Sequence, residues 1–431
     1  MRDRAVAEEG GRAARYRDVF AVREFRVLFV THLVSIAGDQ LARVALAVLV
    51  FGRTGSPALA ALSYALTLVP ELVGGPLLAG LADRYPRRTL MIVCDLSRAG
   101  LVAVMAVPGM PLWVLGVLVF ALPLVGAPYK AARAAILPTI LAADRYEVGI
   151  GATYTALQVG ILGGYTVGAP LVAWLGPEWA LLLDAGTFVL AAVLVAAGLG
   201  PHPTATGAGP PPATLAAFRG LVGLVWTDRR LRYLLAFGCL TGCYTVAAGL
   251  AVPFAAQVGA GTEAVGLLLA AHPAGCALGA AVLTRLVPPG RRLVLLGPLA
   301  VATSAVLLPI GLVPGLGITV ALCVLCGLLS GHDAVAVAAF TRTVPAERRG
   351  QAYGLAGAVV RGSQGVGAAL AGVVAQFSSP SAAIAMFAAV GVLAGTGVAA
   401  GWRRARGQGA APAGSDGPTE RGGPCPATDP H

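Results

Sequence analysis

Long apolar runs separated by short polar stretches fill most of the chain. Runs of about 20 mostly apolar residues are long enough to cross roughly 30 Å of hydrocarbon as helices. We count twelve such runs: 27–51, 57–81, 89–107, 111–129, 148–175, 179–199, 232–256, 263–284, 292–312, 316–340, 351–375 and 381–402. The fourth could extend through Leu141. Because backbone groups in a bilayer core find no water, the runs predict helices, and they lack the alternation of β-barrel strands.

Composition and charge support a membrane protein with a defined orientation. Only 12% of the 431 residues are charged and 57% are hydrophobic, whereas roughly a quarter of a soluble protein is charged. Of the 31 Lys and Arg, 27 lie in or beside the two tails and the even-numbered connections between runs. Loops rich in Lys and Arg stay in the cytoplasm, so both termini are predicted to be cytoplasmic. The net charge of +11 then follows from topology and requires no nucleic acid.

The runs divide into two sets of six around a Pro- and Gly-rich stretch at 201–213. This predicts an all-α membrane protein with an internal duplication. The predicted parts are a cytoplasmic segment (1–26), an N-terminal six-helix half (27–199), a cytoplasmic linker (200–231), a C-terminal six-helix half (232–402) and a disordered tail (403–431).

The sequence offers no enzyme, metal or cofactor motif. Six of the seven cysteines lie within apolar runs, where they act as small hydrophobic residues. Cys323 and Cys326 have CxxC spacing without a nearby histidine or second pair, which favours packing over metal binding. We find no nucleophile elbow, P-loop or HExxH, so an enzyme is not expected.

A compact charged cluster, "GLADRYPRR", separates the second and third runs. It resembles the loop motif between helices 2 and 3 of the major facilitator superfamily. The matching positions are Gly80, Asp83, Arg84, Arg87 and Arg88, with Pro86 where that family usually has glycine.

Further phrases resemble the drug-efflux-like branch of that superfamily, which includes macrolide and siderophore exporters: "SIAGDQLARVALAVLV", "DLSRAG", "LDAGTF" and "ERRGQAYGL". The run "GGYTVGAPLVAWLG" departs from the exporter pattern because no Gly-Gly follows its proline. The resemblance implies two six-helix halves and a small-molecule substrate.

In that family the loop cluster is a gate. The resemblance implies that Asp83 lies at the N-terminus of helix 11, where the helix dipole favours an anion, and that the arginines hold carboxylates. Asp95 and Arg98 in the third run are the expected partners of this gate. The alternative is that these charges only set the topology.

Charged residues inside membrane runs are expensive and are therefore candidates for function. Asp39 and Arg43 are four residues apart on one helical face and can pair, either as a proton site or as a packing ion pair. Glu71 and Arg361 each lie ten residues, about 15 Å, from the inner end of their runs. The family fold places helices 2 and 11 against each other, so we predict that these two residues pair across the halves.

Two histidines add candidates for proton handling, because histidine titrates nearest neutrality. His272 precedes Pro273 in the eighth run, and His332 adjoins Asp333 in the tenth. A structural, hydrogen-bonded role is the alternative for each. Asp184, near the outer end of the sixth run, is interpreted as a packing residue.

The resemblance places the substrate in a central cavity, for which five polar side chains are candidates: Tyr154, Gln158, Thr241, Tyr244 and Thr245. A mostly apolar pocket with hydroxyls and aromatic rings suits a hydrophobic organic molecule, including a cationic one, better than a sugar.

These observations predict proton-driven efflux of small hydrophobic compounds by alternating access. A dedicated siderophore or metabolite exporter, an importer, and a non-transporting receptor or scaffold are the alternatives. The expected partners are a small-molecule substrate, protons and the lipid bilayer, and the chain is expected to be a monomer. The strong preference for Arg over Lys, with abundant Ala, Gly and Val, suggests a GC-rich bacterial genome and hence the cytoplasmic membrane.

Overall fold

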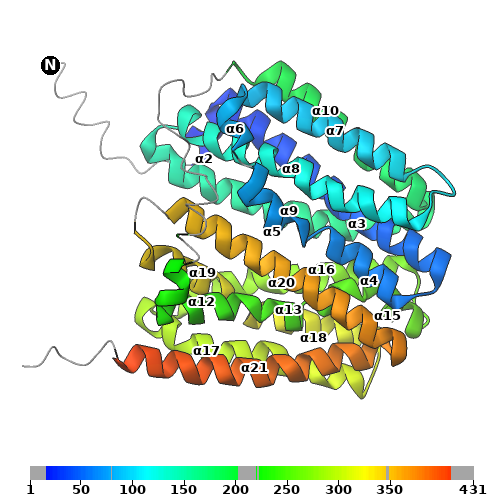
Figure 1. Ribbon diagram of the computed structural model, residues 1–431, viewed down its shortest axis with the longest axis vertical. Helices are drawn as coiled ribbons and strands as arrows, with labels where there is room; N and C mark the ends of the chain where they lie inside the picture. The colour runs from blue at the N-terminus through cyan, green and yellow to red at the C-terminus, as the bar shows by residue number, and fades with distance from the viewer. Residues whose placement is uncertain (1–15, 79, 202–219, 221–222, 346–348, 409–431) are drawn as a thin grey trace, which may run out of the picture.

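The computed structural model describes residues 16–78, 80–201, 220, 223–345 and 349–408, and every regular element within them is a helix (Figure 1). Eleven helical segments of this part are long and apolar enough to cross a membrane. The helix α7 (Arg87–Met105) has a similar length but carries four charged residues, and it supplies the twelfth crossing. The predicted all-α membrane fold is therefore confirmed.

The N-terminal half consists of a short helix and the first six crossings: α2 (Tyr16–Ala21), α3 (Arg23–Thr54), α4 (Pro57–Leu66), α5 (Pro70–Leu78), α6 (Leu81–Arg84), α7, α8 (Leu112–Ile140), α9 (Ala143–Leu175) and α10 (Pro177–Gly198). The long helix α3 packs against α9 and α10, and α7 packs between α8 and α10. Charged side chains of α3 and α7 consequently face a shared interior.

The C-terminal half contains the other six crossings, several of them divided: α12 (Arg229–Cys239), α13 (Thr241–Tyr244), α14 (Val246–Gly249), α15 (Ala251–Gln257), α16 (Thr262–Leu286), α17 (Pro289–Ala305) with η1 (Leu308–Gly311), α18 (Leu316–Leu329), α19 (His332–Thr343), α20 (Arg349–Phe377) and α21 (Pro380–Gln408). The first run of this half thus becomes four short helices.

Several predicted boundaries shift. The fourth run does not end at 129 but continues to Ile140, which places Lys130 and Arg133 inside α8 rather than in a connection. The second run breaks before Pro70, because proline has no N–H for the helical bond. The side chain of Asp228 caps the start of α12, so the C-terminal half begins three residues before 232. Most of the predicted linker and tail (202–219 and 409–431) lies outside the described residues.

The first and last described helices end on the same side of the molecule, at the left in Figure 1. The start of α2, the arginine-bearing helix α6 and the end of α21 all lie there. We call this side the inner end, because the positive-inside rule assigns it to the cytoplasm.

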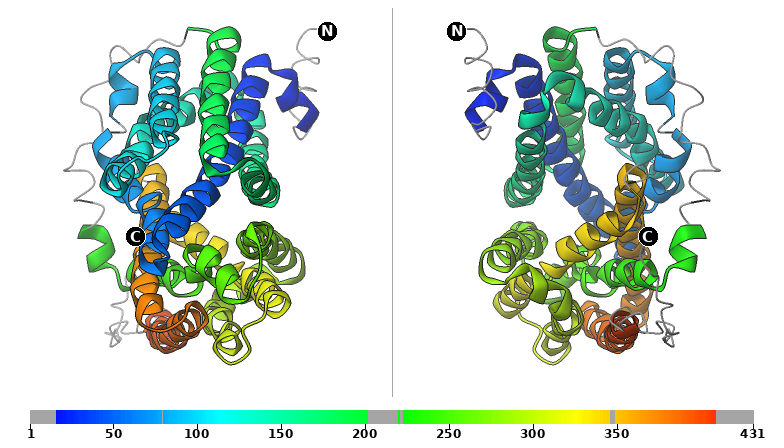
Figure 2. Two further views of the ribbon diagram at one scale, coloured as in Figure 1. Left: turned by 90° about the vertical axis from the view of Figure 1, so that its right-hand side faces the viewer. Right: turned by 90° about the vertical axis from the view of Figure 1, so that its left-hand side faces the viewer.

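The two halves form separate bundles that meet along a central seam (Figure 2). The seam is formed by α4 against α20 and by α9 against α16. It is closed at the outer end, where Ser56 Oγ donates a hydrogen bond to Gln376 Oε1 at 2.7 Å. Toward the inner end, Tyr154 of α9 and Tyr353 of α20 are 50% and 60% exposed. The seam therefore opens toward the inner end.

Candidate functional site

One carboxylate joins the two halves at the centre of the seam. Glu71 Oε2 lies 2.6 Å from Arg361 Nε of α20, and Glu71 Oε1 lies 2.8 Å from Lys130 Nζ of α8. The structure thus brings together the predicted pair of Glu71 and Arg361, with Lys130 as an additional partner.

Local structure fixes Glu71 in this position. It is the second residue of α5, directly after the break between α4 and α5, and α5 packs against both α8 and α20. The Glu71 side chain is 14% exposed, whereas those of Lys130 and Arg361 are 54% and 45% exposed. One carboxylate thus connects two cations that belong to opposite halves of the molecule.

The second predicted pair is wrong. Asp39 Oδ1 pairs with Arg98 Nη2 of α7 at 2.8 Å, and not with Arg43 one turn along its own helix. Arg43 Nη1 instead donates a hydrogen bond to Gln40 Oε1 at 3.0 Å. Spacing of four residues only permits a contact, and here the long side chain of Arg98 in α7 brings its guanidinium within ion-pair distance of Asp39.

Arg98 is the centre of a buried group of acids in the N-terminal half. Its Nη1 lies 3.7 Å from Asp95 Oδ1, and its guanidinium carbon lies 3.9 Å from the ring centroid of Phe188. Asp95 and Asp184 have no exposed surface. Thr187 Oγ1 donates to Asp184 Oδ1 at 3.1 Å. Three carboxyl groups, those of Asp39, Asp95 and Asp184, thus lie around one cation.

The arrangement of the loop cluster differs from the implied gate. Arg87 Nη1 donates to the carbonyl of Ala135 at 3.0 Å, and Arg88 Nη2 donates to the carbonyl of Ala196. The Ala196 carbonyl lies in the last turn of α10, where the helix dipole favours a cation, and the Ala135 carbonyl lies five residues before the end of α8. The two arginines therefore bind backbone carbonyls, where carboxylates were expected. Arg84 is exposed.

Asp95 and Arg98 are not partners of the loop arginines, because Arg98 forms ion pairs with Asp39 and Asp95 within the bundle. Gly80 precedes the first turn of α6, and α6 packs against α7 and α8. The Asp83 side chain lies outside the described residues, so its implied position at the start of helix 11 stays a prediction.

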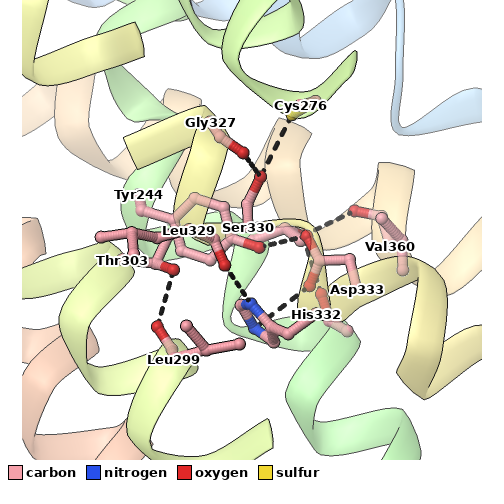
Figure 3. Close-up of polar contacts among 12 residues, drawn as sticks. Tyr244, Cys276, Leu299, Thr303, Gly327, Leu329, Ser330, His332, Asp333 and Val360 are labelled. Atoms are coloured by element: carbon pink, nitrogen blue, oxygen red, sulfur yellow. Dashed lines mark hydrogen bonds and ion pairs between the residues drawn. The ribbon is translucent and has the colours of Figure 1, made fainter. Parts of the chain in front are cut away.

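A second polar cluster lies inside the C-terminal half (Figure 3). The Tyr244 hydroxyl donates to Asp333 Oδ2, and His332 Nε2 lies 3.4 Å from Asp333 Oδ1. Cys276 Sγ lies 3.1 Å from Ser330 Oγ and 3.5 Å from His272 Nδ1. His272 is thus a neighbour of this cluster through Cys276.

The five predicted cavity residues separate into two groups. Tyr154 is half exposed and Gln158 is partly exposed, as a lining residue requires. Thr241 and Tyr244 are only 2% and 1% exposed, so they are interior residues and that part of the prediction is wrong. Thr245 is partly exposed and donates to the Thr241 carbonyl at 2.7 Å. Thr241 and Tyr244 of α13 instead form hydrogen bonds within the C-terminal half, with Ser363 and Asp333.

Sequence reasoning missed three basic side chains of the site, Lys130, Arg133 and His32. Lys130 and Arg133 are three residues apart on one face of α8, and His32 of α3 lies within electrostatic reach of both. The signal was present, because the apolar pattern of this run continues to Leu141. Within the described residues, no group of three or more His, Cys, Asp or Glu is placed to hold a metal ion.

A comparison with protein families matches nearly all of the described chain. The model described as Major Facilitator Superfamily matches residues 28–332 and, in a second match, 233–422. Among curated proteins, the uncharacterized MFS-type transporter YvqJ of Bacillus subtilis (strain 168) is 25% identical over 178 residues, covering 40% of this chain. The uncharacterized MFS-type transporter YkuC of the same organism is 25% identical over 183 residues, covering 41%. Each alignment spans 42% of the relative's length.

Solved transporter structures share the fold. A bacterial homolog to the human lysosomal transporter Spinster, in an inward-facing and occupied conformation, superposes with a TM-score of 0.69 at 13% identity, covering 89% of this chain and 96% of that one. A POT family transporter in complex with 5-aminolevulinic acid gives 0.70 at 12% identity, covering 89% and 96%. A mutant of the nucleoside transporter NupG gives 0.70 at 12% identity, covering 88% and 99%. At these identities the likeness shows the fold alone.

Proposed function

Because the chain belongs to the major facilitator superfamily, we propose that this membrane transporter is a proton-coupled exporter of small organic compounds, placed in the bacterial cytoplasmic membrane. The observation that supports coupling is the central ion pair. Glu71 is held by Arg361 at 2.6 Å across the seam while the seam is open at its inner end. An acid that forms an ion pair between the two halves when the seam is open inside is suitably placed to link proton binding to the movement of the halves.

The proposed cycle starts from this inner-open state. A substrate enters between the halves from the cytoplasm, beside Tyr154 and Gln158, while Glu71 is ionised and paired. After the seam closes inside and opens outside, a proton reaches Glu71 and weakens its hold on Lys130 and Arg361. Return to the inner-open state releases the proton to the cytoplasm and restores both ion pairs.

The test uses purified protein in liposomes that contain a pH-sensitive dye. A panel of hydrophobic dyes of either charge is added under an imposed pH gradient, and dye movement and lumenal pH are recorded together. We expect movement of a compound to be accompanied by proton movement in the wild type, and Glu71→Gln to abolish the coupling. Glu178→Gln, which alters an acid of the outer end of α10, is the matched control.

Transport that proceeds without any change of lumenal pH would disprove proton coupling. Loss of coupling in Asp39→Asn instead of Glu71→Gln would move the proton site into the N-terminal half. The lack of any movement across the panel would favour a dedicated metabolite exporter or a non-transporting receptor.

One observation favours import as a second candidate. Glu71 holds two cations, so a proton on Glu71 would free both for an anionic substrate, and proton and anion would bind together. An inward proton gradient would then drive uptake. In the liposome assay, import is recognised by accumulation on the alkaline side of the membrane.

A further inference from the structure

We infer that the substrate carries an anionic group, which Lys130, Arg133 and Arg361 bind between the halves. This inference rests on the proposed transport function only for the location of the site. It concerns the sign of the substrate charge. The sequence had predicted a hydrophobic molecule, including a cationic one.

Cations outnumber acids on the surfaces that face the seam. Four basic side chains at mid-membrane depth keep exposed surface: Arg43, Lys130, Arg133 and Arg361. Only Glu71 forms an ion pair with any of them in the described part of the chain, and it is shared by Lys130 and Arg361. Arg133 Nη1 is buried and has no hydrogen-bond partner among the described residues.

The remaining acids at this depth do not balance these charges. Asp39 is already paired with Arg98, and Asp95 and Asp184 behind it have no exposed surface. Asp333 belongs to the C-terminal half, where Tyr244 donates to it. Counting the three acids that keep exposed surface, Asp39, Glu71 and Asp333, as ionised against the four cations still leaves one positive charge in surplus.

This surplus faces the substrate path and not the lipid. A charged side chain exposed to hydrocarbon at the middle of the bilayer costs several kcal/mol, which favours placing it toward water or a partner. Lys130 and Arg361 reach the same carboxylate from opposite halves, so their exposed surface lies at the seam. Arg133 follows Lys130 on the same face of α8, and His32 is within electrostatic reach of both.

The chemistry of the cluster suits an organic anion. Guanidinium groups bind carboxylate or phosphate oxygens through paired N–H donors, and a lysine adds a point charge. One aromatic ring with exposed surface lies near the cations, because Arg43 is within electrostatic reach of the partly exposed Tyr64. A largely apolar molecule with one carboxylate, sulfonate or phosphate group would bind the cations through its anionic group and contact the aromatic ring through its apolar part.

The test compares two ions of nearly equal size and shape but opposite charge. Binding of tetraphenylborate and of tetraphenylphosphonium to the purified full-length protein in neutral detergent is measured by equilibrium dialysis. We expect the borate to bind at least about tenfold more tightly than the phosphonium. The double variant Lys130→Gln with Arg133→Gln should weaken borate binding by about tenfold or more, without weakening the phosphonium.

Two further variants separate charge from folding. Arg133→Lys keeps the charge and should retain borate binding, and Arg404→Gln removes an exposed arginine of α21 and should change nothing. Tighter phosphonium binding, equal binding of the two ions, absence of binding, or borate binding that the double variant leaves intact would each overturn the inference. Dialysis requires neither transport nor a pH gradient, so a failure of the proposed proton coupling would leave this result unaffected.

Discussion

At the scale of single residues, depth along a helix was a better guide than spacing within it. Glu71 and Arg361 could be paired because each lies ten residues from the inner end of its run and the family that the sequence resembles places these two helices against each other. Asp39 and Arg43 are four residues apart, yet their side chains take different partners. Spacing states which contacts are possible, while the direction of each side chain and the nearest neighbouring helix decide which one forms.

Arg361 gives the sharpest prediction at this scale. Arg361→Ala leaves Glu71 with Lys130 alone and removes the bond between halves, so we expect the transport rate to fall about tenfold. Adding Glu71→Ala should restore part of the loss, because the unpaired carboxylate is removed as well. The transport rates of the two single variants and of the double variant are measured in the same liposomes. Together they give the interaction energy between the Glu71 and Arg361 side chains. Strictly additive losses would show that the two side chains act independently.

At the scale of helices, hydrophobic run length predicted nearly every crossing but not the breaks within them. The second, seventh, ninth and tenth runs are divided in the structure. Glycine and proline occur in continuous membrane helices as well as in broken ones, so their presence in a run does not distinguish the two. The fourth run is an example. Its end was placed too early, so Lys130 and Arg133, which lie inside α8, were assigned to a connection and not to the site.

The contact between α16 and α18 gives a prediction for helix packing. A Cβ atom added at Gly327 would lie against the His272 carbonyl oxygen, closer than two atoms can approach without movement of the backbone. Gly327→Ala should therefore lower stability by about 1–3 kcal/mol, seen as a lower melting temperature in detergent. Gly317→Ala in the same helix meets no atom within 4 Å and is the control. Equal melting temperatures for the two variants would contradict this packing.

At the scale of the whole molecule, the two six-helix halves were predictable, but the direction in which they open was not. The six runs on each side of the central Pro- and Gly-rich stretch already indicated a duplication. Inner-open and outer-open states use the same helices with the same hydrophobic runs, so the sequence pattern does not distinguish them. The distinction comes from tertiary contacts, such as Ser56 with Gln376 at the outer end.

A cross-link at that outer contact tests alternating access. Ser56→Cys combined with Gln376→Cys, joined by an oxidant or a short bifunctional thiol reagent, should hold the outer end closed. We expect cross-linking to reduce transport to the level of empty liposomes, and a reducing agent to restore it for the oxidised pair. The two single cysteine variants, treated identically, control for the native cysteines. Full transport by the cross-linked protein would exclude opening at this end.

The position of Lys130 also has a consequence for how the chain enters the membrane during synthesis. A lysine and an arginine near the middle of a segment each cost about 2.5–3.5 kcal/mol when the segment passes from the translocon into lipid. Glu71 is made 59 residues before Lys130, so the lysine meets an acid that has already been inserted. Arg361 arrives only with the eleventh crossing. The ion pair within the first half can therefore assist insertion of α8, and the bond that joins the halves is completed near the end of translation.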